Sequence, residues 1–270
     1  MTGHPPSEGR PPAEPRPVDE RVEAHRADGH PTDAHATDAR PADKHRADAQ
    51  GWAALHGGLT PSVPVRVWLG AVQRLAAVGP VARIPPDALS AAGVVAAAGA
   101  ALVAGRWPLL TAGLVVLVGV LDGLDGAVAL HTGRARPLGA VVDAVADRIG
   151  DLLLAAVLAV LGAPPAWCVG AAALTLLHEY LRARANAAGM RGPGAVTVAE
   201  RPTRLVLVAV AGLGAGVLPG GTPWTGWDWA TVSVAGWVAV GVVGLVHLGV
   251  GVVRTTPRRF PDDHAAGGTG

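Results

Sequence analysis

Cysteine is almost absent from the chain, whose 270 residues include one, Cys168. A single cysteine excludes an internal disulfide framework, and in an apolar stretch a lone thiol usually packs as a small hydrophobic side chain. Tyrosine and phenylalanine occur once each, although tryptophan occurs eight times. The net charge is only +1, so the charge balance gives no indication of nucleic acid, and no nucleic-acid partner is expected.

Charge is also missing from long stretches after residue 87, while 50% of the residues are apolar and the mean hydropathy is +0.35. This composition is too hydrophobic for an ordinary soluble domain. A bilayer core needs about 20 helical residues, and long runs without alternation favour helices over a barrel. The predicted fold class is therefore all-α, an integral membrane protein with six transmembrane helices preceded by a juxtamembrane amphipathic helix. The candidate spans are 87–105, 109–130, 138–162, 166–185, 204–219 (the shortest) and 229–253.

The composition divides the chain into four regions. Residues 1–58 are predicted to be a disordered low-complexity tail with a five-residue His/Asp repeat. The repeat is either a solvated tail or a weakly metal-binding or pH-sensitive segment. Residues 59–84 predict the juxtamembrane amphipathic helix, with a buried helix as the alternative. Residues 85–254 form the six-helix transmembrane domain, and 255–270 a disordered C-terminal tail.

Arginine is concentrated in the connections on one side of the predicted bundle, after the second, fourth and sixth spans. The connections on the other side carry only Arg106, together with most of the tryptophans. The positive-inside rule and an aromatic belt both place the two termini and the acidic segment in the cytoplasm. Because the alanine and glycine content is typical of a high-GC bacterium, the expected location is the bacterial inner (cell) membrane.

Five aspartates interrupt the apolar runs near the cytoplasmic side. Asp122 and Asp125 are three residues apart, and Asp143, Asp147 and Asp151 are four apart, so each set shares a helix face. The short connection between the two spans predicts antiparallel neighbours whose acidic faces meet. Carboxylates inside a membrane need a positive partner. The nearest arginines, at 134 and 136, lie in the predicted loop. Divalent cations are therefore the better partners of the carboxylates, and such cations suit phosphoryl transfer.

The spacing of these residues carries a resemblance to a known family. The chain reads Asp122-x2-Asp125-Gly126-x2-Ala129, followed by Gly139-x3-Asp143-x3-Asp147. This pattern resembles the signature of the CDP-alcohol phosphatidyltransferase family, D-x2-D-G-x2-A-R-x8-G-x3-D-x3-D, with seven of the eight fixed positions and every spacing kept. The resemblance extends over about residues 61–258.

The resemblance implies an enzyme that moves a phosphatidyl group from CDP-diacylglycerol to the hydroxyl of a polar alcohol, phosphorylated or not. It releases CMP and acts in phospholipid biosynthesis. The resemblance also implies two Mg²⁺ or Mn²⁺ ions and a homodimer in the lipid bilayer. The implied metal ligands are Asp122, Asp125, Asp143 and Asp147. Asp147 is also the implied general base, and the nucleotide-binding candidates are Gly126, Ala129, Arg134 and Gly139.

The chain departs from the signature at Leu130, where the family has an arginine associated with the nucleotide's phosphates. A second stretch, 178–205, resembles the actinobacterial phosphatidylinositol-phosphate synthase branch, which implies that Arg182, Arg184 and Arg204 hold the acceptor. Glu179 lies in this stretch and disfavours an anionic acceptor, so the acceptor stays open.

Two alternatives to an active transferase remain at this point. Leu130 and Glu179 are compatible with a catalytically degenerate family member that has a binding role. A cation transporter would explain carboxylates inside a membrane in general, but it does not explain their spacing.

Overall fold

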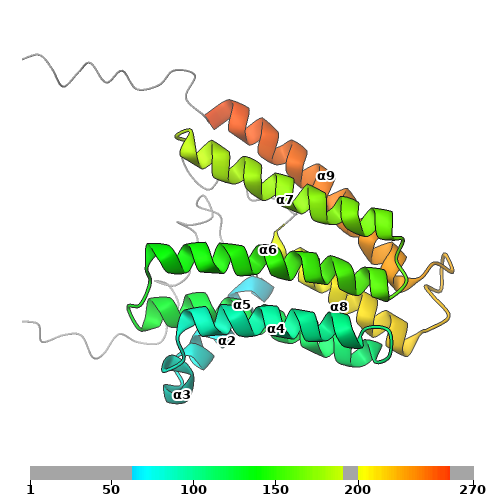
Figure 1. Ribbon diagram of the computed structural model, residues 1–270, viewed down its shortest axis with the longest axis horizontal. Helices are drawn as coiled ribbons and strands as arrows, with labels where there is room; N and C mark the ends of the chain where they lie inside the picture. Colours follow the sequence, from blue (N-terminus) through cyan, green and yellow to red (C-terminus); the bar gives the residue numbers. More distant parts are fainter. Residues whose placement is uncertain (1–62, 191–199, 256–270) are drawn as a thin grey trace, which may run out of the picture. The chain divides into compact units, whose positions relative to one another are not determined.

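The computed structural model describes residues 63–190 and 200–255, which belong to one compact unit of the chain, His45–Gly270. Within these residues all regular secondary structure is helical, which confirms the all-α prediction (Figure 1). The predicted tail 1–58 and residues 256–270 of the predicted C-terminal tail lie outside the described residues. The helices are α2 (Val63–Ala76), α3 (Gly79–Ala82), α4 (Pro86–Val103), α5 (Pro108–His131), α6 (Pro137–Val160), α7 (Pro165–Ala187), α8 (Arg201–Val217) and α9 (Trp229–Thr255).

Proline and glycine mark where the long helices begin and end. Each helix from α4 to α8 has a proline in its first two positions, where the fixed φ suits a helix and the missing N–H is not needed. Gly133 and Gly162 follow α5 and α6 with φ of +66° and +109°, a left-handed conformation that glycine adopts without a steric penalty. These breaks leave Asp122 in the second half of α5 and Asp147 in the first half of α6.

The six long helices, α4 to α9, alternate in direction (Figure 1). α4 packs against α5 and α6, α8 against α5 and α9, and α7 against α6 and α9. The α4–α5, α6–α7 and α8–α9 connections gather at one end, here called the tryptophan end because it carries Trp107, Trp167, Trp224 and Trp227. The opposite end, where α5 ends and α6 begins, is called the acidic end.

The prediction that the second and third spans pack as direct neighbours is wrong. α5 and α6 run antiparallel but hardly contact each other, because α4 packs against both (Figure 1). Their acidic faces still meet, since side chains of α4, α5, α6 and α8 line one small cavity. The site is therefore built from four helices rather than from one helical hairpin.

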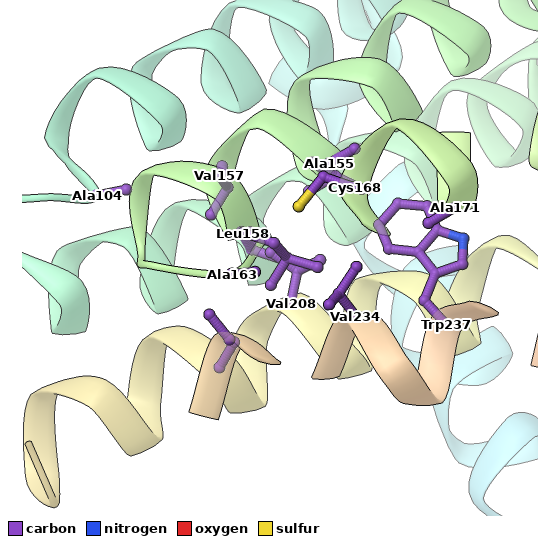
Figure 2. Close-up of a cluster of buried hydrophobic side chains, with 14 of the residues drawn as sticks. Ala104, Ala155, Val157, Leu158, Ala163, Cys168, Ala171, Val208, Val234 and Trp237 are labelled. Atoms are coloured by element: carbon purple, nitrogen blue, oxygen red, sulfur yellow. The ribbon is translucent and has the colours of Figure 1, made fainter. Parts of the chain in front are cut away.

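The main hydrophobic core lies in the half of the bundle nearer the tryptophan end (Figure 2). It draws buried side chains from all six long helices, including Leu158 of α6 and Val208 of α8. Trp237 of α9 is buried there, and its indole N–H donates to Thr175 Oγ1 at 3.1 Å, which satisfies the polar group of the ring. Cys168 packs in the same core as the small hydrophobic side chain expected from the sequence.

A smaller apolar cluster packs α2 against the bundle at the acidic end. Val72 and Ala76 of α2 are buried together with Leu124 of α5. Gly123 allows this close approach, because a Cβ at that position would lie 3.3 Å from Val72 Cγ2. α2 lies within the segment predicted to be a juxtamembrane amphipathic helix, and one of its faces packs against α5.

The outer surface of the bundle is strongly apolar. Leu102, Val169 and Val253 have exposed fractions of 86%, 69% and 74%, and a soluble monomer rarely exposes so many large apolar side chains together. Among the described residues, α4, α5 and α9 are long and apolar enough to cross a membrane. α6 and α7 carry several charged residues and α8 has 17 residues, so length and apolarity alone identify three of the six expected spans.

Candidate active site

Aspartates from two helices converge at the acidic end. Asp122 of α5 and Asp143 and Asp147 of α6 each offer a carboxylate oxygen, and these oxygens lie within 4.8 Å of one another. The three side chains line a cavity of about 10 Å³ together with Ser90 of α4 and Arg201 of α8. The two acidic helix faces predicted from the sequence therefore meet at this cavity.

Asp125, the fourth predicted metal ligand, lines the same cavity but does not belong to the group of three. Its carboxylate is buried and accepts two hydrogen bonds, from Ser90 Oγ to Oδ2 at 2.6 Å and from Gly126 N to Oδ1 at 2.6 Å. These bonds fix the carboxylate beside the cluster. Because a carboxylate oxygen that accepts one hydrogen bond keeps a second lone pair, Asp125 remains a candidate ligand.

Arg201 of α8 supplies positive charge to the cluster. Its Nε lies 3.2 Å from Asp122 Oδ1, and its Nη1 contacts Asp147 Oδ1. The side chain is only 12% exposed, and Gly150 of α6 makes room for it, since a Cβ at 150 would lie 3.0 Å from Arg201 Nη2. The sequence-based preference for cations over arginines weighed only the arginines of the predicted loop, and so it missed Arg201.

The cluster is compatible with a divalent cation. Carboxylate oxygens are the ligands that Mg²⁺ and Mn²⁺ prefer, and three of them converge here. The Arg201 guanidinium already contacts two of the three carboxylates, which shows that the arrangement attracts positive charge. The predicted metal site therefore fits the chemistry and the placement of these side chains.

Arg148 of α6 links the cluster to a second group of charges. Its Nη2 lies 3.5 Å from Asp147 Oδ2 and 3.4 Å from Asp151 Oδ2. Its Nη1 lies 3.3 Å from Glu179 Oε1 on α7. The second group, called the ion-pair network from here on, consists of Arg148, Asp151, Glu179, Arg182, Glu200 and Arg204.

Two ion pairs set the register of α6 against α8. Asp147 contacts Arg201, and Asp151 contacts Arg204 with Nη2 3.2 Å from Oδ2. Both partners advance by about one turn from the first pair to the second, so α6 and α8 run in the same direction where they meet. The side chains of Asp151 and Arg204 are 1% and 3% exposed, and removing either one would take an ion-pair contact from a buried charge, which is destabilising.

The predicted acceptor-binding arginines do not share one location. Arg204 is buried against Asp151, and Arg182 Nη2 lies 3.1 Å from Glu200 Oε1. Arg184 is exposed and follows Arg182 by two residues, which places it on a different face of α7. Arg182 and Arg204 therefore belong to the ion-pair network, whereas Arg184 points away from that face.

The predicted nucleotide contacts lie around the α5–α6 connection. Gly126 is exposed on α5, and a Cβ built there would have no heavy atom within 4 Å. Ala129 lies three residues further along the same helix, and Arg134 is exposed in the connection. Leu130, at the position of the family's arginine, is 74% exposed, so its side chain fills no core space.

Gly139, the remaining predicted nucleotide contact, lies at the start of α6. A Cβ there would come within 3.3 Å of Arg136 Cγ. Arg136 in turn forms an ion pair with Asp87 in the first turn of α4. The glycine therefore leaves space for a contact between the ends of α4 and α6.

The sequence-based site omits three side chains, Ser90, Arg148 and Arg201. Two had usable signals: Arg148 is a charge inside an apolar run next to Asp147, and Arg201 lies three residues before Arg204 and so shares its helix face. Ser90 had none, because its hydrogen-bond partner is 35 residues away in the chain.

The apolar helical bundle and its carboxylate cluster indicate a membrane protein whose carboxylates suit a divalent cation. The sequence model of the CDP-alcohol phosphatidyltransferase family matches residues 83–250, which is more than half of the chain. The chain belongs to this family and is a phosphotransferase of phospholipid biosynthesis.

The chain is similar to named synthases of bacteria and archaea. It is 37% identical over 198 residues to the phosphatidylinositol phosphate synthase of Mycolicibacterium smegmatis, covering 69% of this chain and 85% of the relative. It is also 37% identical over 103 residues to the archaetidylinositol phosphate synthase of Aeropyrum pernix, covering 37% of this chain and 53% of the relative.

Solved structures of similar proteins share the fold. The Mycobacterium tuberculosis phosphatidylinositol phosphate synthase with CDP-DAG bound is 27% identical with a TM-score of 0.53, covering 73% of this chain and 99% of that chain. The same synthase in complex with manganese and citrate is 25% identical with a TM-score of 0.54, covering 72% of this chain and 93% of that chain.

Proposed function

We propose that the chain transfers the phosphatidyl group of CDP-diacylglycerol to a hydroxyl of a polar alcohol and releases CMP. The observation that carries this proposal is the convergence of Asp122, Asp143 and Asp147 at the spacing of the family signature. The CDP-DAG bound to a solved relative supports the choice of donor.

Asp147 is the proposed general base. The acceptor hydroxyl gives its proton to the Asp147 carboxylate while its oxygen bonds to the phosphorus that carries diacylglycerol. The bond from that phosphorus to the oxygen of the CMP phosphate breaks, and the electron pair leaves with CMP. Contacts with Arg148 and Arg201 hold the carboxylate in place for this transfer.

Asp122, Asp125, Asp143 and Asp147 are the proposed ligands of two Mg²⁺ or Mn²⁺ ions. When bound, such ions supply positive charge that stabilises the phosphate oxygens. The manganese in a solved relative supports this assignment, as does the arrangement of three carboxylates around a shared cavity.

The proposed nucleotide surface is formed by the end of α5 and the start of α6. Gly126, Ala129 and Gly139 present little or no side chain there, which allows a nucleotide to approach the backbone. Arg134 is proposed to contact the phosphates, since the position of the family's arginine is occupied by Leu130. The exposure of Arg134 supports this role, because its side chain is not held in the core.

The proposed membrane arrangement has six spans, α4 to α9, with both termini and the site in the cytoplasm of a bacterial cell. The alternation of helix direction supports it (Figure 1), as does the exposure of Trp107, Trp167, Trp224 and Trp227 at the far end. The four proposed metal ligands all lie in the halves of α5 and α6 nearer the acidic end instead of spreading along the full length of the bundle, which does not favour a cation pathway. The homodimer rests on the family resemblance and stays a prediction.

The test is CMP release by the purified full chain in detergent with CDP-diacylglycerol and Mg²⁺. The acceptors are inositol, inositol phosphate, glycerol phosphate, serine and a second phospholipid. We expect release with at least one acceptor and a loss of about 100-fold or more in Asp147→Asn, because a positioned base contributes about that much. Asp228→Asn, an exposed carboxylate in the α8–α9 connection, is the control and should keep full activity. Absence of release with every acceptor, or full activity of Asp147→Asn, would contradict the proposal.

A further inference from the structure

The ion-pair network lies directly beside the proposed base. Arg148 contacts Asp147 with one nitrogen and Glu179 with another. A molecule whose hydroxyl reaches Asp147 from the side of α7 has its remaining atoms close to Arg148 and Glu179. The charges of the network must then influence which alcohol can bind.

The positive charges of the network are balanced by carboxylates. Its three guanidinium groups, on Arg148, Arg182 and Arg204, face three carboxylates, on Glu179, Glu200 and Asp151, so the formal charge is 3 − 3 = 0. Each guanidinium has a carboxylate partner within 3.5 Å. The network thus presents polar atoms of both signs and no net positive charge.

Two effects disfavour the binding of a phosphate ester beside the ion-pair network. Its negative charge would lie next to Glu179, whose own charge is half-buried, and like charges at short range repel strongly in a partly buried site. To bind an arginine directly it would compete with the carboxylates that already contact the three guanidinium groups, and weakening such a pair in a partly buried site is costly.

We propose that the acceptor is an uncharged polyhydric alcohol and not a phosphate ester, and that Glu179 determines this preference. The inference rests on the proposed phosphatidyl transfer and names the substrate class of that reaction. Hydroxyl groups both donate and accept hydrogen bonds, so a polyol finds acceptors on Glu179 and donors on Arg148 without separating any ion pair.

Glu179 is the best carboxylate to substitute in a test of this preference for an uncharged acceptor. It lies on α7, outside the aspartate cluster, and its contacts are Arg148 Nη1 at 3.3 Å and His178 Nδ1 at 3.7 Å. Asp151 is unsuitable because it is fully buried against two arginines. Replacing Glu179 by glutamine keeps the shape of the side chain, while it leaves the network with a net charge of +1.

The experiment compares matched acceptor pairs with the full chain in detergent, CDP-diacylglycerol and Mg²⁺. The pairs are inositol with inositol 1-phosphate and glycerol with glycerol 3-phosphate, and the readout is kcat/KM for CMP release. The wild type should favour the uncharged member of at least one pair by about tenfold or more. Glu179→Gln should shift the ratio toward the phosphorylated member by about tenfold, mainly through KM.

Two controls separate charge from structure. Glu179→Asp keeps the charge and should keep the wild-type preference, and Asp228→Asn removes an exposed charge far along the chain and should change neither ratio. A wild type that favours the phosphorylated member of both pairs would overturn the inference, as would an unchanged ratio in Glu179→Gln.

Failure of the proposed function has a different signature, namely no CMP release with any acceptor. In that case thermal stabilisation of the wild-type chain is measured with inositol and with inositol 1-phosphate. Stabilisation by inositol supports the inference about the network. Stabilisation by the phosphate ester alone, or by neither compound, overturns it.

Discussion

At the scale of single residues, the Arg201 guanidinium competes with a metal ion for the same carboxylates. It contacts Asp122 and Asp147, two of the proposed ligands. Removing the positive charge of Arg201 relieves its repulsion of a metal cation at contact distance, which amounts to more than about 1 kcal/mol. We therefore expect Arg201→Gln to bind Mn²⁺ about tenfold more tightly than the wild type, measured by electron paramagnetic resonance of the free ion.

The same substitution should lower the melting temperature in EDTA, because Asp122 and Asp147 each lose a contact with a positive charge when no metal is present. Arg106→Gln, an exposed arginine at the tryptophan end, provides the control and should change neither quantity. Weaker or unaltered Mn²⁺ binding by Arg201→Gln would show that Arg201 does not compete with metal.

Leu130 is a second residue with a measurable consequence. Its side chain is 74% exposed on α5, so an arginine can be placed there without disturbing the core. A charge-assisted contact with a phosphate is worth about 1 kcal/mol at an exposed site. Leu130→Arg is therefore expected to lower the KM for CDP-diacylglycerol about fivefold, with Leu130→Gln as the uncharged control. A KM that is equal in the two variants would mean that this position does not meet the phosphates.

At the scale of helices, the alternation of direction makes a prediction about sidedness. In a Cys168→Ala background, which removes the single native cysteine, Ala135→Cys reports on the α5–α6 connection and Asp228→Cys on the α8–α9 connection. A membrane-impermeant maleimide added to intact spheroplasts should label only Asp228→Cys, because the proposed arrangement has the acidic end in the cytoplasm. Permeabilised cells should label both, and labelling of Ala135→Cys in intact spheroplasts would contradict the arrangement.

The helices were predictable from local chemistry, whereas their neighbours were not. Proline at the start and glycine after the end are local signals, so the expected span 87–105 agrees closely with α4 at Pro86–Val103. The partner of a helix depends on packing between distant segments. A short loop correctly predicts that α5 and α6 are antiparallel, but it does not reveal that α4 packs against both.

The site was likewise predictable only in part: its aspartates were, but their partners from distant helices were not. Asp122, Asp143 and Asp147 have regular spacings that place them on defined helix faces, and they converge as expected. The charges that neutralise them come from other parts of the chain: Arg201 arrives from α8, 54 residues beyond Asp147 (201 − 147). Such long-range pairs leave little trace in the spacing of one sequence, although Arg148 was visible beside Asp147.

At the scale of the whole molecule, length and hydropathy identify fewer spans than the six proposed. α4, α5 and α9 are recognised as candidate spans, but α6 and α7 carry the charges of the site and network. Most of those charges contact a partner of opposite sign within the bundle, which is the usual arrangement for ionisable groups inside membranes. Of the helices that carry the site and the network, α6 and α7 are therefore the ones that look least like spans, whereas α5 is recognised.

The hydrophobic core lies near the tryptophan end (Figure 2), and its position also determines which end of the bundle unfolds more readily. Apolar packing near that end does not depend on ions, whereas the acidic end depends on paired charges that salt weakens. Amide hydrogen exchange should therefore be slowest around Leu158 and Val208 and fastest in the first turns of α6, and added salt should widen the difference. Uniform exchange along α6 would contradict this expectation. If the gradient is observed, the end that holds the proposed site can open and close while the rest of the bundle stays folded.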